Sequence, residues 1–500
     1  MSVSPISNSA SLAVQQLVNT RKQLDELQRQ LATGLKSANY AGLGLDSGMT
    51  VSLNSQLSAI DGYNSTIDQV MTRINLMDNS LSGMTDLASL VKKAMMDVPV
   101  APEGSGATLA QQTAQNSLDQ LLAMLNTQAG DRYLFSGRAT DEPPVETLDH
   151  ILNGNGTQAG LKQLISERNQ ADVGTSGLGR LVLSTPTATS VQVDEDAVSP
   201  FGFKLASVTS ALTNATTSGP AGSPASLTVD LSGGNPNDGD TITFRFTLPD
   251  GSTENLTLTA TTNSPPGTNQ FTIGATPAAT TTNLQTTLTT ALGTLAATSL
   301  TAASSVAASN EFFDGDATSP PLRVNGPPYD SATSQVAGTI TNTVIWYTGE
   351  VGSDPARSTA TARIDQSLVV SYGARANEVA IRALVQNMAN LAAVTISPSD
   401  PNAVGLSGAL NRRLISNMTP GTGVQTIRNI ETDLASAQTS LSAAKDRHRQ
   451  TSATLADFLQ EIQGVSNEQV GAQILSLQTR MQASMQTTAL LFQTSLVNYL

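Results

Sequence analysis

The chain has 500 residues, of which 39% are hydrophobic, but only 13% are charged, about half of the ~25% usual in soluble proteins. Its 26 basic residues against 40 acidic ones give a net charge of −14, which argues against nucleic acid as a partner and against a basic helix on a membrane surface. Because cysteine is absent, disulfides, thiolate metal sites and cysteine nucleophiles are ruled out together.

The N-terminus does not resemble a conventional secretory signal. The first twenty residues, MSVSPISNSASLAVQQLVNT, contain neither a basic n-region nor an apolar h-region. We also find no apolar run that approaches the ~20 residues a membrane-spanning helix needs. If the protein leaves the cell, we expect a route that does not read such a signal.

Three helices are predicted in the N-terminal part of the chain. Leucines recur close to heptad spacing over residues 17–35, and a second run over 53–91 alternates steps of three and four for more than five heptads. A third run covers residues 109–125. The first two patterns predict coiled-coil seams. The seam positions expected here are Leu24, Leu31, Leu53, Leu57, Ile60, Ile67, Ile74 and Leu81.

The same alternation returns in the C-terminal part. It runs from about 424 to 465, stops at the segment GVSNE, and resumes from Val470. Helices this long need partner helices, and those of the N-terminal part are the natural ones. His448 falls on the seam, where we expect a partly buried polar residue that sets the register. The other seam positions expected here are Ile427, Leu434, Leu441, Leu455, Ile462, Ile474, Leu477 and Met481.

The middle of the chain, about 180–345, is rich in Thr, Ser, Gly and Pro and alternates with period two. TITFRFTL (241–248) and TENLTLTA (253–260) flank PDGS, which predicts a β-hairpin. The large apolar residues of the first strand would share one face. A short helix is predicted near 281–295. We interpret this region as a β-rich domain with about one helix, inserted between two halves of a helical domain.

Tyr133 and Phe135 stand two apart in the segment DRYLFSG (131–137), although only 4% of the residues are aromatic. The segment follows a helix and precedes two prolines. Since aromatic side chains bury a large area per residue, we predict that these two anchor a short hairpin near 131–145 on the helical part.

The expected fold is mainly α with a β-rich insertion. A long antiparallel coiled-coil rod would be built from both termini, and a β-containing domain would point outward from it. Residues 1–145 would form the N-terminal half of the rod, 146–342 the inserted variable domain, and 343–500 the C-terminal half.

No motif predicts catalysis. GLGLDSG (42–48) has phosphate-loop spacing but follows a helix rather than a strand, so it predicts a helix-to-helix turn. His150 and His448 are isolated, and no G-x-S-x-G elbow occurs. NPNDGD (235–240) lacks EF-hand spacing and predicts a turn. We therefore expect a protein that is not an enzyme, with no catalytic residue, cofactor or metal.

Residues 31–36, LATGLK, fit the pattern L-x-[ST]-G-L-[KR] and are followed by a loop and a long helix. This region resembles the N-terminal region of bacterial flagellins and their relatives, although YAGLGLDSG replaces the usual Asp-Asp-Ala-Ala-Gly-Leu loop. DRYLFSG resembles the [GQ]-x-Y-[IL]-F-[SG]-G segment of the hook-associated members that join the flagellar hook to the filament. The ending, residues 477–500, is similar to theirs. VIWYTGE and SYGARANEVAIRALV resemble alphaproteobacterial versions.

The resemblance covers about residues 1–145 and 343–500 and implies a structural subunit of the extracellular flagellum that serves motility. It implies export by the flagellar type III apparatus without a cleaved signal peptide. The implied partners are copies of itself in a ring or helical tube, a hook-associated protein on the hook side, flagellin or its like on the filament side, and an export chaperone. Neither nucleic acid nor membrane is an expected partner.

Two alternatives remain open at this point. One is a filament flagellin from the same family. The other is an extracellular adhesin that works through the β-rich insert.

Overall fold

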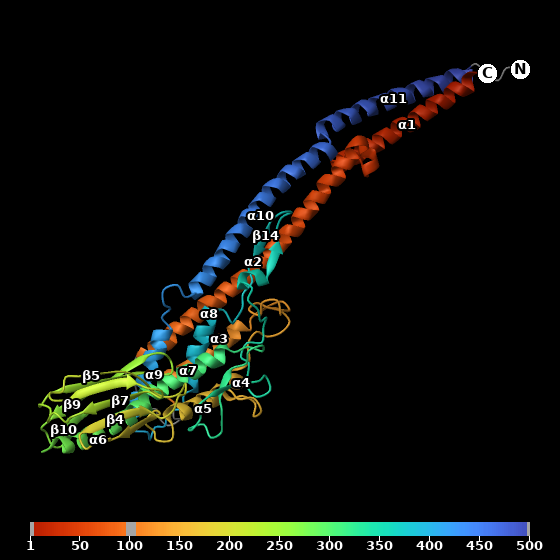
Figure 1. Cartoon of the computed structure of the whole chain (residues 1–500). Helices are drawn as coiled ribbons and strands as arrows, with labels where there is room; N and C mark the ends of the chain where they lie inside the picture. Colours follow the sequence, from red (N-terminus) through yellow and green to blue (C-terminus); the bar gives the residue numbers. More distant parts are fainter. Residues whose placement is uncertain (1–4, 97–106, 498–500) are drawn as a thin grey trace. The chain divides into compact units, whose positions relative to one another are not determined.

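The computed structural model describes residues 5–96 and 107–497, and the side chains of 11–96 and 107–490. The chain is about 53% helical, with long terminal helices and a β-containing middle region, which confirms the coarse fold prediction (Figure 1). It divides into two compact units. The first comprises Met1–Val70, Ala362–Val370 and Thr439–Leu500, and the second comprises Met71–Thr361 and Ser371–Gln438.

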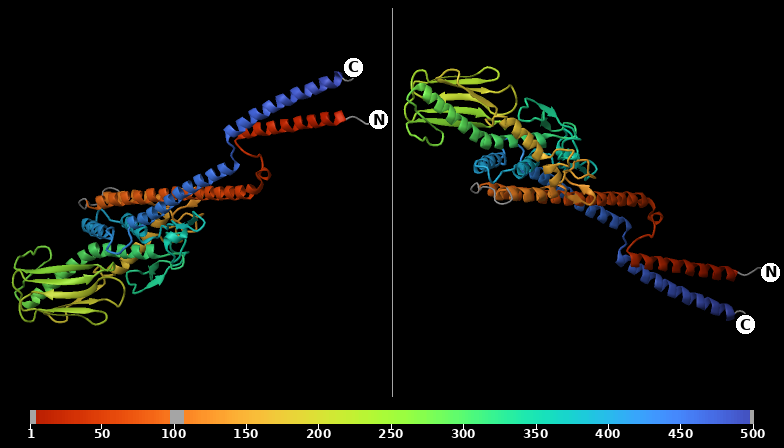
Figure 2. Two further views of the ribbon diagram at one scale, coloured as in Figure 1. Left: turned by 90° about the horizontal axis from the view of Figure 1, so that it is seen from above. Right: turned by 90° about the horizontal axis from the view of Figure 1, so that it is seen from below.

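The first unit is almost entirely helical. Helices α1 (Pro5–Thr33) and α11 (Asn467–Val497) lie side by side and run in opposite directions (Figure 2). The 3₁₀ segment η1 (Tyr40–Asp46) leads into α2 (Ser47–Met96), whose first half belongs to this unit together with the second half of α10 (Ile427–Gln463). The helices predicted over 17–35, 53–91 and 424–465 are therefore confirmed.

The helical part of the second unit contains the remainder of α2 and α10 with three shorter helices, α3 (Leu109–Leu125), α8 (Val379–Ala393) and α9 (Ala403–Asn417). Helix α3 begins at a capping box in which Thr108 and Gln111 exchange hydrogen bonds, and it packs against α8. The helix predicted over residues 109–125 is confirmed as α3, whereas the sequence did not predict α9.

The inserted region begins with helices α4 (Leu148–Asn153) and α5 (Leu161–Val173), which the sequence did not predict. Two four-stranded sheets follow, with strand orders β3-β4-β7-β6 and β10-β9-β8-β5. All neighbours are antiparallel except β9 and β10, which are parallel. The strands are β3 (Leu181–Ser184), β4 (Ser190–Glu195), β5 (Lys204–Ser210), β6 (Thr216–Ala221), β7 (Ser226–Asp230), β8 (Thr241–Thr247), β9 (Thr253–Thr261) and β10 (Gln270–Thr272).

The predicted hairpin is confirmed as β8 and β9, with Phe244 opposite Leu256. Its turn is closed by a backbone hydrogen bond from Leu248 to Ser252 of 2.8 Å. Ile242, Phe244 and Phe246 are fully buried and face the same core as the inward side chains of the other sheet. The core therefore lies between the two sheets and against α6 (Pro277–Leu295).

The predicted short helix near 281–295 is much longer in the structure. Helix α6 continues through a π-helical turn (Ala296–Leu300) into α7 (Thr301–Asp314). The sequence prediction missed α7 because its Ala and Ser residues show no period of large apolar side chains. These small residues are buried on nearly every side, since they let α7 approach α5 and α8 closely.

This long helix also corrects the expectation that no apolar run is long enough to span a membrane. Among the described residues, Pro277–Asp314 has the length and composition to do so, but 67% of its most apolar window is buried inside the protein. A core helix gives the same result, so the finding is weak evidence for a membrane span.

The insert ends in a two-stranded sheet of β11 (Leu322–Val324) and β12 (Gln335–Ala337), which packs on α5. A buried ionic network lies beside it. Arg168 binds Asp172 at 2.9 Å and Glu311 at 2.7 Å, so it links α5 to α7. The predicted boundaries at 145/146 and 342/343 remain predictions.

Candidate assembly surfaces

The seam between α1 and α11 is only partly closed. Leu24 and Val470 are buried, with 8% and 4% exposure. The predicted seam residues Ile474, Leu477 and Met481 are half-buried and follow Val470 at steps of four, three and four. The apolar residues therefore lie on the side of α11 where the sequence placed them, but two helices alone leave much of that side accessible to water.

Leu31 differs from its expected position. Its side chain is 42% exposed, so it is not enclosed by the seam of this chain. Its two predecessors in the last turn of α1, Arg29 and Gln30, donate hydrogen bonds to the carbonyl oxygen of Lys36 at 3.3 and 2.9 Å. These hydrogen bonds join the last turn of α1 to the loop that follows it.

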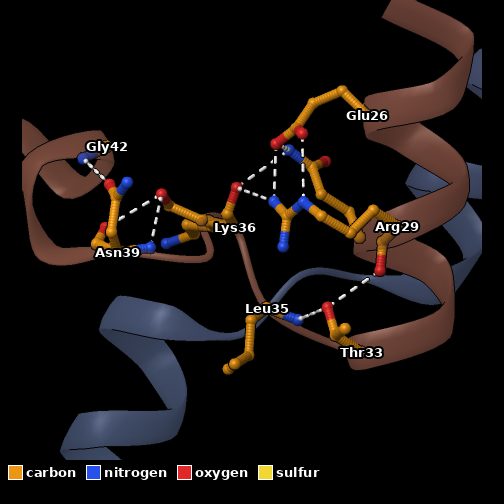
Figure 3. Close-up of polar contacts among 9 residues, drawn as sticks. Glu26, Arg29, Thr33, Leu35, Lys36, Asn39 and Gly42 are labelled. Carbon is orange, nitrogen blue, oxygen red and sulfur yellow. Dashed lines mark hydrogen bonds and ion pairs between the residues drawn. The ribbon is translucent and has the colours of Figure 1, made fainter.

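The ends of α1 and α10 meet at a paired break in the helices (Figure 3). Leu35 forms an antiparallel bridge with Gly464. The Lys36 N–H donates to Gln463 O at 2.7 Å, and the Val465 N–H donates to Gly34 O at 3.0 Å. Gly34 has φ +70°, a conformation that ends a helix and favours glycine.

Lys36 also caps α10, a role that the sequence reasoning missed. Its Nζ donates to the carbonyl oxygens of Glu461 and Ile462 at 3.0 and 2.8 Å. A cation there stabilises the negative end of the helix dipole. The signal available in the sequence was a basic residue directly after the Gly-Leu that ends α1. The LATGLK motif thus ends one helix and caps another.

In the same unit, α2 and α10 share a small apolar cluster. Leu53, Ile60 and Leu455 are buried at 6%, 9% and 9% exposure, and Leu57 and Ile462 are half-buried against them. Ile67 and Leu441 are fully buried. All seven are seam positions expected from the sequence.

His448 is buried, as the sequence predicted. Its Nδ1 lies 3.1 Å from Asn64 Oδ1, and its ring stacks on Tyr63 with centroids 5.8 Å apart. Nε2 lies 3.8 Å from a carboxylate oxygen of Asp365, which belongs to the hairpin of β13 (Thr361–Arg363) and β14 (Val369–Ser371). A polar pair at this position fixes one register of α10 against α2.

The seam residues in the second unit are more deeply buried. Ile74, Leu81 and Leu434 are at most 1% exposed, while Ile427, at the start of α10, is half-buried. Gln438 donates a hydrogen bond to Asn75 Oδ1 beside them. These positions stabilise the fold of the monomer.

Tyr133 and Phe135 lie at a junction of three segments in the second unit. The hairpin itself is β1 (Gln128–Ala129) with β2 (Arg132–Tyr133), so it begins earlier than predicted and contains Tyr133 but not Phe135. Tyr133 is half-buried and Phe135 is fully buried. The Phe135 carbonyl accepts from the Ala376 N–H at 2.8 Å.

Charged groups close this junction. Arg138 binds Glu350 at 2.5 Å and Asp354 at 3.0 Å, and the Glu350 N–H donates to Ser136 O at 2.9 Å. Arg375 donates to the carbonyl oxygens of Gly352 and Asp354 at 2.9 and 2.6 Å. DRYLFSG, WYTGE and SYGARANE, which are far apart in the sequence, are therefore neighbours in the fold.

Tyr347 completes the packing of this junction. Its side chain is 1% exposed, and its hydroxyl donates to Glu350 O at 3.1 Å. Burial raises the pKa of Tyr347 well above its usual range. A neutral phenol there is a structural group, and its ring packs on Trp346 with centroids 5.9 Å apart.

Large apolar side chains remain exposed along the first unit. Leu12 and Val14 on α1 are 60% and 52% exposed, and Leu475 and Met485 on α11 are 66% and 45% exposed. In a single chain these side chains are accessible to water.

The chemistry needed for a catalytic or metal site is sparse. Within the described part of the chain, no group of three His, Asp or Glu side chains is placed to hold a metal ion. His150 Nδ1 lies 2.9 Å from a carboxylate oxygen of Glu146, four residues earlier in the chain. NPNDGD forms a turn in which Asp240 accepts the N–H groups of Thr213 and Asn237, both at 2.8 Å.

Comparison with known proteins identifies one similarity. Residues 6–140 match the model of the bacterial flagellin N-terminal helical region. This segment contains α1, η1, α2, α3 and the hairpin β1–β2. No curated protein matches the chain. The similarity therefore concerns the N-terminal share of the paired break and of both seams.

Proposed function

We propose that this chain is a structural subunit of the bacterial flagellum, without catalytic activity, that works by polymerising through its terminal helices. The similarity of residues 6–140 to the N-terminal helical region of flagellins supports this proposal. It is carried by one observation, the α1–α11 pair whose apolar seam stays half exposed in the single chain.

In this proposal the terminal helices form an antiparallel coiled-coil rod. Neighbouring copies cover the apolar residues that are exposed to solvent in the single chain. Burying one Leu or Ile contributes about 1.5–3 kcal/mol, so a few such residues per contact are sufficient for stable association. The subunit acts outside the cell and is exported through the flagellar type III route. The β-rich insert faces outward.

Within that class, we infer a position at the junction between hook and filament. One end would contact a hook-associated protein and the other the first flagellin subunits. The support is the three-segment junction, in which Phe135, Arg138 and Glu350 join the DRYLFSG and WYTGE segments that resemble hook-associated proteins.

Immunogold electron microscopy tests both levels of the proposal. Antibody raised against residues 180–340 should label a narrow band between hook and filament. Label along the whole filament would replace the junction role with that of a filament flagellin. Label absent from flagella, in cells where the antibody detects the protein, would overturn the flagellar assignment.

A further inference from the structure

The segment between α1 and α2 carries an unusually exposed leucine. Leu45 lies near the end of η1 and has 101% of its reference surface exposed, and Met49, one turn further on, is 54% exposed. Gly44, just before it, has φ +60° and ψ −123°, a backbone conformation that favours glycine over other residues. We call residues 40–46 the Leu45 loop.

A groove of about 600 Å³ lies elsewhere in the same unit, between α1 and α11. Leu27 and Leu477 supply its apolar lining, and Lys22 and Arg480 supply two cationic groups. We call it the α1–α11 groove. Its one carboxylate, Glu26, is already engaged by Arg29 at 2.5 Å.

The lining of the groove contains two cationic side chains and one carboxylate. Among the described residues, neither Lys22 nor Arg480 has an ion-pair partner, although the protein carries a net charge of −14. Asp46 follows Leu45 directly and is exposed. The loop thus presents an apolar side chain next to an anion, and the groove presents an apolar lining next to two cations.

We propose that the Leu45 loop of one copy occupies the α1–α11 groove of a second copy, with Leu45 against Leu27 and Leu477 and with Asp46 paired to Lys22 or Arg480. This inference rests on the proposed polymerisation and names one of its contacts. The loop and the groove are different surfaces, so the contact is heterologous and repeats from copy to copy, as a ring or helical tube requires.

Charge reversal in the full-length chain tests the pairing. Two variants are compared with wild type, the single variant Asp46→Lys and the double variant Lys22→Asp with Arg480→Asp. Each should raise the protein concentration needed for assembly at least about tenfold at low ionic strength. The triple variant restores opposite charges and should return close to the wild-type value. Sedimentation and negative-stain microscopy measure this concentration, and circular dichroism verifies that each variant is folded.

Leu45→Ser tests the apolar half of the contact, and Leu322→Ser is its matched control. Leu322 is 44% exposed on β11 in the insert, so its replacement should leave assembly unchanged. If wild type assembles and the variants in the loop and groove assemble equally well, the inference fails while the proposed function stands. If wild type does not assemble under any condition, both fail.

Because the chain contains no cysteine, disulfide trapping gives an independent measurement. Leu45→Cys mixed with Leu477→Cys should form a mixed disulfide dimer on oxidation, detected by a mass tag on one variant. Leu45→Cys mixed with Leu322→Cys should not. Equal yields from the two mixtures would overturn the proposed contact, even if assembly itself occurs.

Discussion

The sheets of the insert and the terminal helix pair differ in how completely they bury their apolar residues. In the insert, 24 buried residues from both sheets and from the helix of 277–314 form one closed cluster. Along α1 and α11, Leu24 and Val470 are the buried residues among the described side chains. Two sheets and a helix can enclose a core, whereas two helices can cover only one stripe of each other.

The remaining surface of the two regions differs accordingly. The outward positions of β8 and β9 carry threonines, and Thr243 Oγ1 lies 2.8 Å from Thr257 Oγ1 across the strands. The terminal helices instead leave Leu12 and Leu475 exposed. The insert therefore completes its core within one chain, while the terminal helices leave apolar side chains exposed, which other copies cover in the function proposed above.

The largest expected effect is a loss of folding stability at seam residues that the single chain buries completely. Seam residues that it leaves half-buried should affect assembly instead. Ile74→Asp places an unpaired carboxylate at a site 1% exposed and should lower the free energy of unfolding by about 4–5 kcal/mol. Leu57→Asp, at a half-buried site, should cost about 1–2 kcal/mol and leave the monomer folded, yet block assembly.

Denaturant titration of the monomer and sedimentation of the polymer measure the two effects separately. Leu434→Asp and Ile462→Asp repeat the comparison on α10, since Leu434 is 1% exposed and Ile462 is half-buried. Equal destabilisation of the monomer by both members of a pair would break the proposed distinction.

The next prediction tests whether the apolar core between the two sheets stabilises the insert. Phe244→Ala removes a fully buried ring between the sheets and should destabilise the second unit by about 3–5 kcal/mol. Arg245→Ala, the next residue on the opposite, exposed face, should change stability by less than about 0.5 kcal/mol. Similar values for the two variants in thermal unfolding would contradict the described packing of β8.

A pH-dependent effect is expected at the ionic network of α5 and α7. Burial raises the pKa of the Asp172 carboxyl, against the opposing effects of the Arg168 guanidinium and the Gly202 N–H. The folded chain therefore holds this proton at pH values where the unfolded chain has released it. The resulting stability is fully present below the unfolded pKa and is lost as pH rises through the folded pKa.

Asp172→Asn removes this linkage while keeping a similar shape. The variant should be about 2 kcal/mol less stable than wild type near pH 4, about the pKa of an unfolded Asp, and the difference should shrink toward neutral pH. Chemical denaturation across this range measures it. Asp141→Asn, at an exposed position, is the control, and a difference that grows with pH would show that the sign is wrong.

The smallest expected effects are changes in folding stability at two glycines of the first unit, one a loss and the other a gain. Gly34→Ala forces a side chain into φ +70° at the paired break and should cost about 1 kcal/mol. Gly62→Ala lies within α2 with no atom near the added methyl group, and it should stabilise the helix by about 0.5–1 kcal/mol. Thermal unfolding of both variants tests this, and a loss of stability at Gly62 would reveal a hidden contact.

Much of the candidate site was predictable because its apolar residues recur at heptad spacing in the sequence. Seam positions such as Ile67, Leu441 and Met481 follow the heptad, and one period of side chains is enough to indicate a shared face. The paired break was not predictable, because Lys36 acts on Glu461 and Ile462, 425 and 426 residues away. Leu31 matched the heptad but lies in a turn occupied with hydrogen bonds to Lys36.

The sequence by itself determined the long helices, the β8–β9 hairpin and the core face of that hairpin, because each depends on a local period or a local turn. Only the tertiary structure decided that the Ala- and Ser-rich segment 301–314 is a buried helix, since small residues gain their stabilisation from close neighbours rather than from a pattern. It also decided that Phe135, Glu350 and Arg375 meet in one junction, because hydrogen bonds between distant segments leave no period to read.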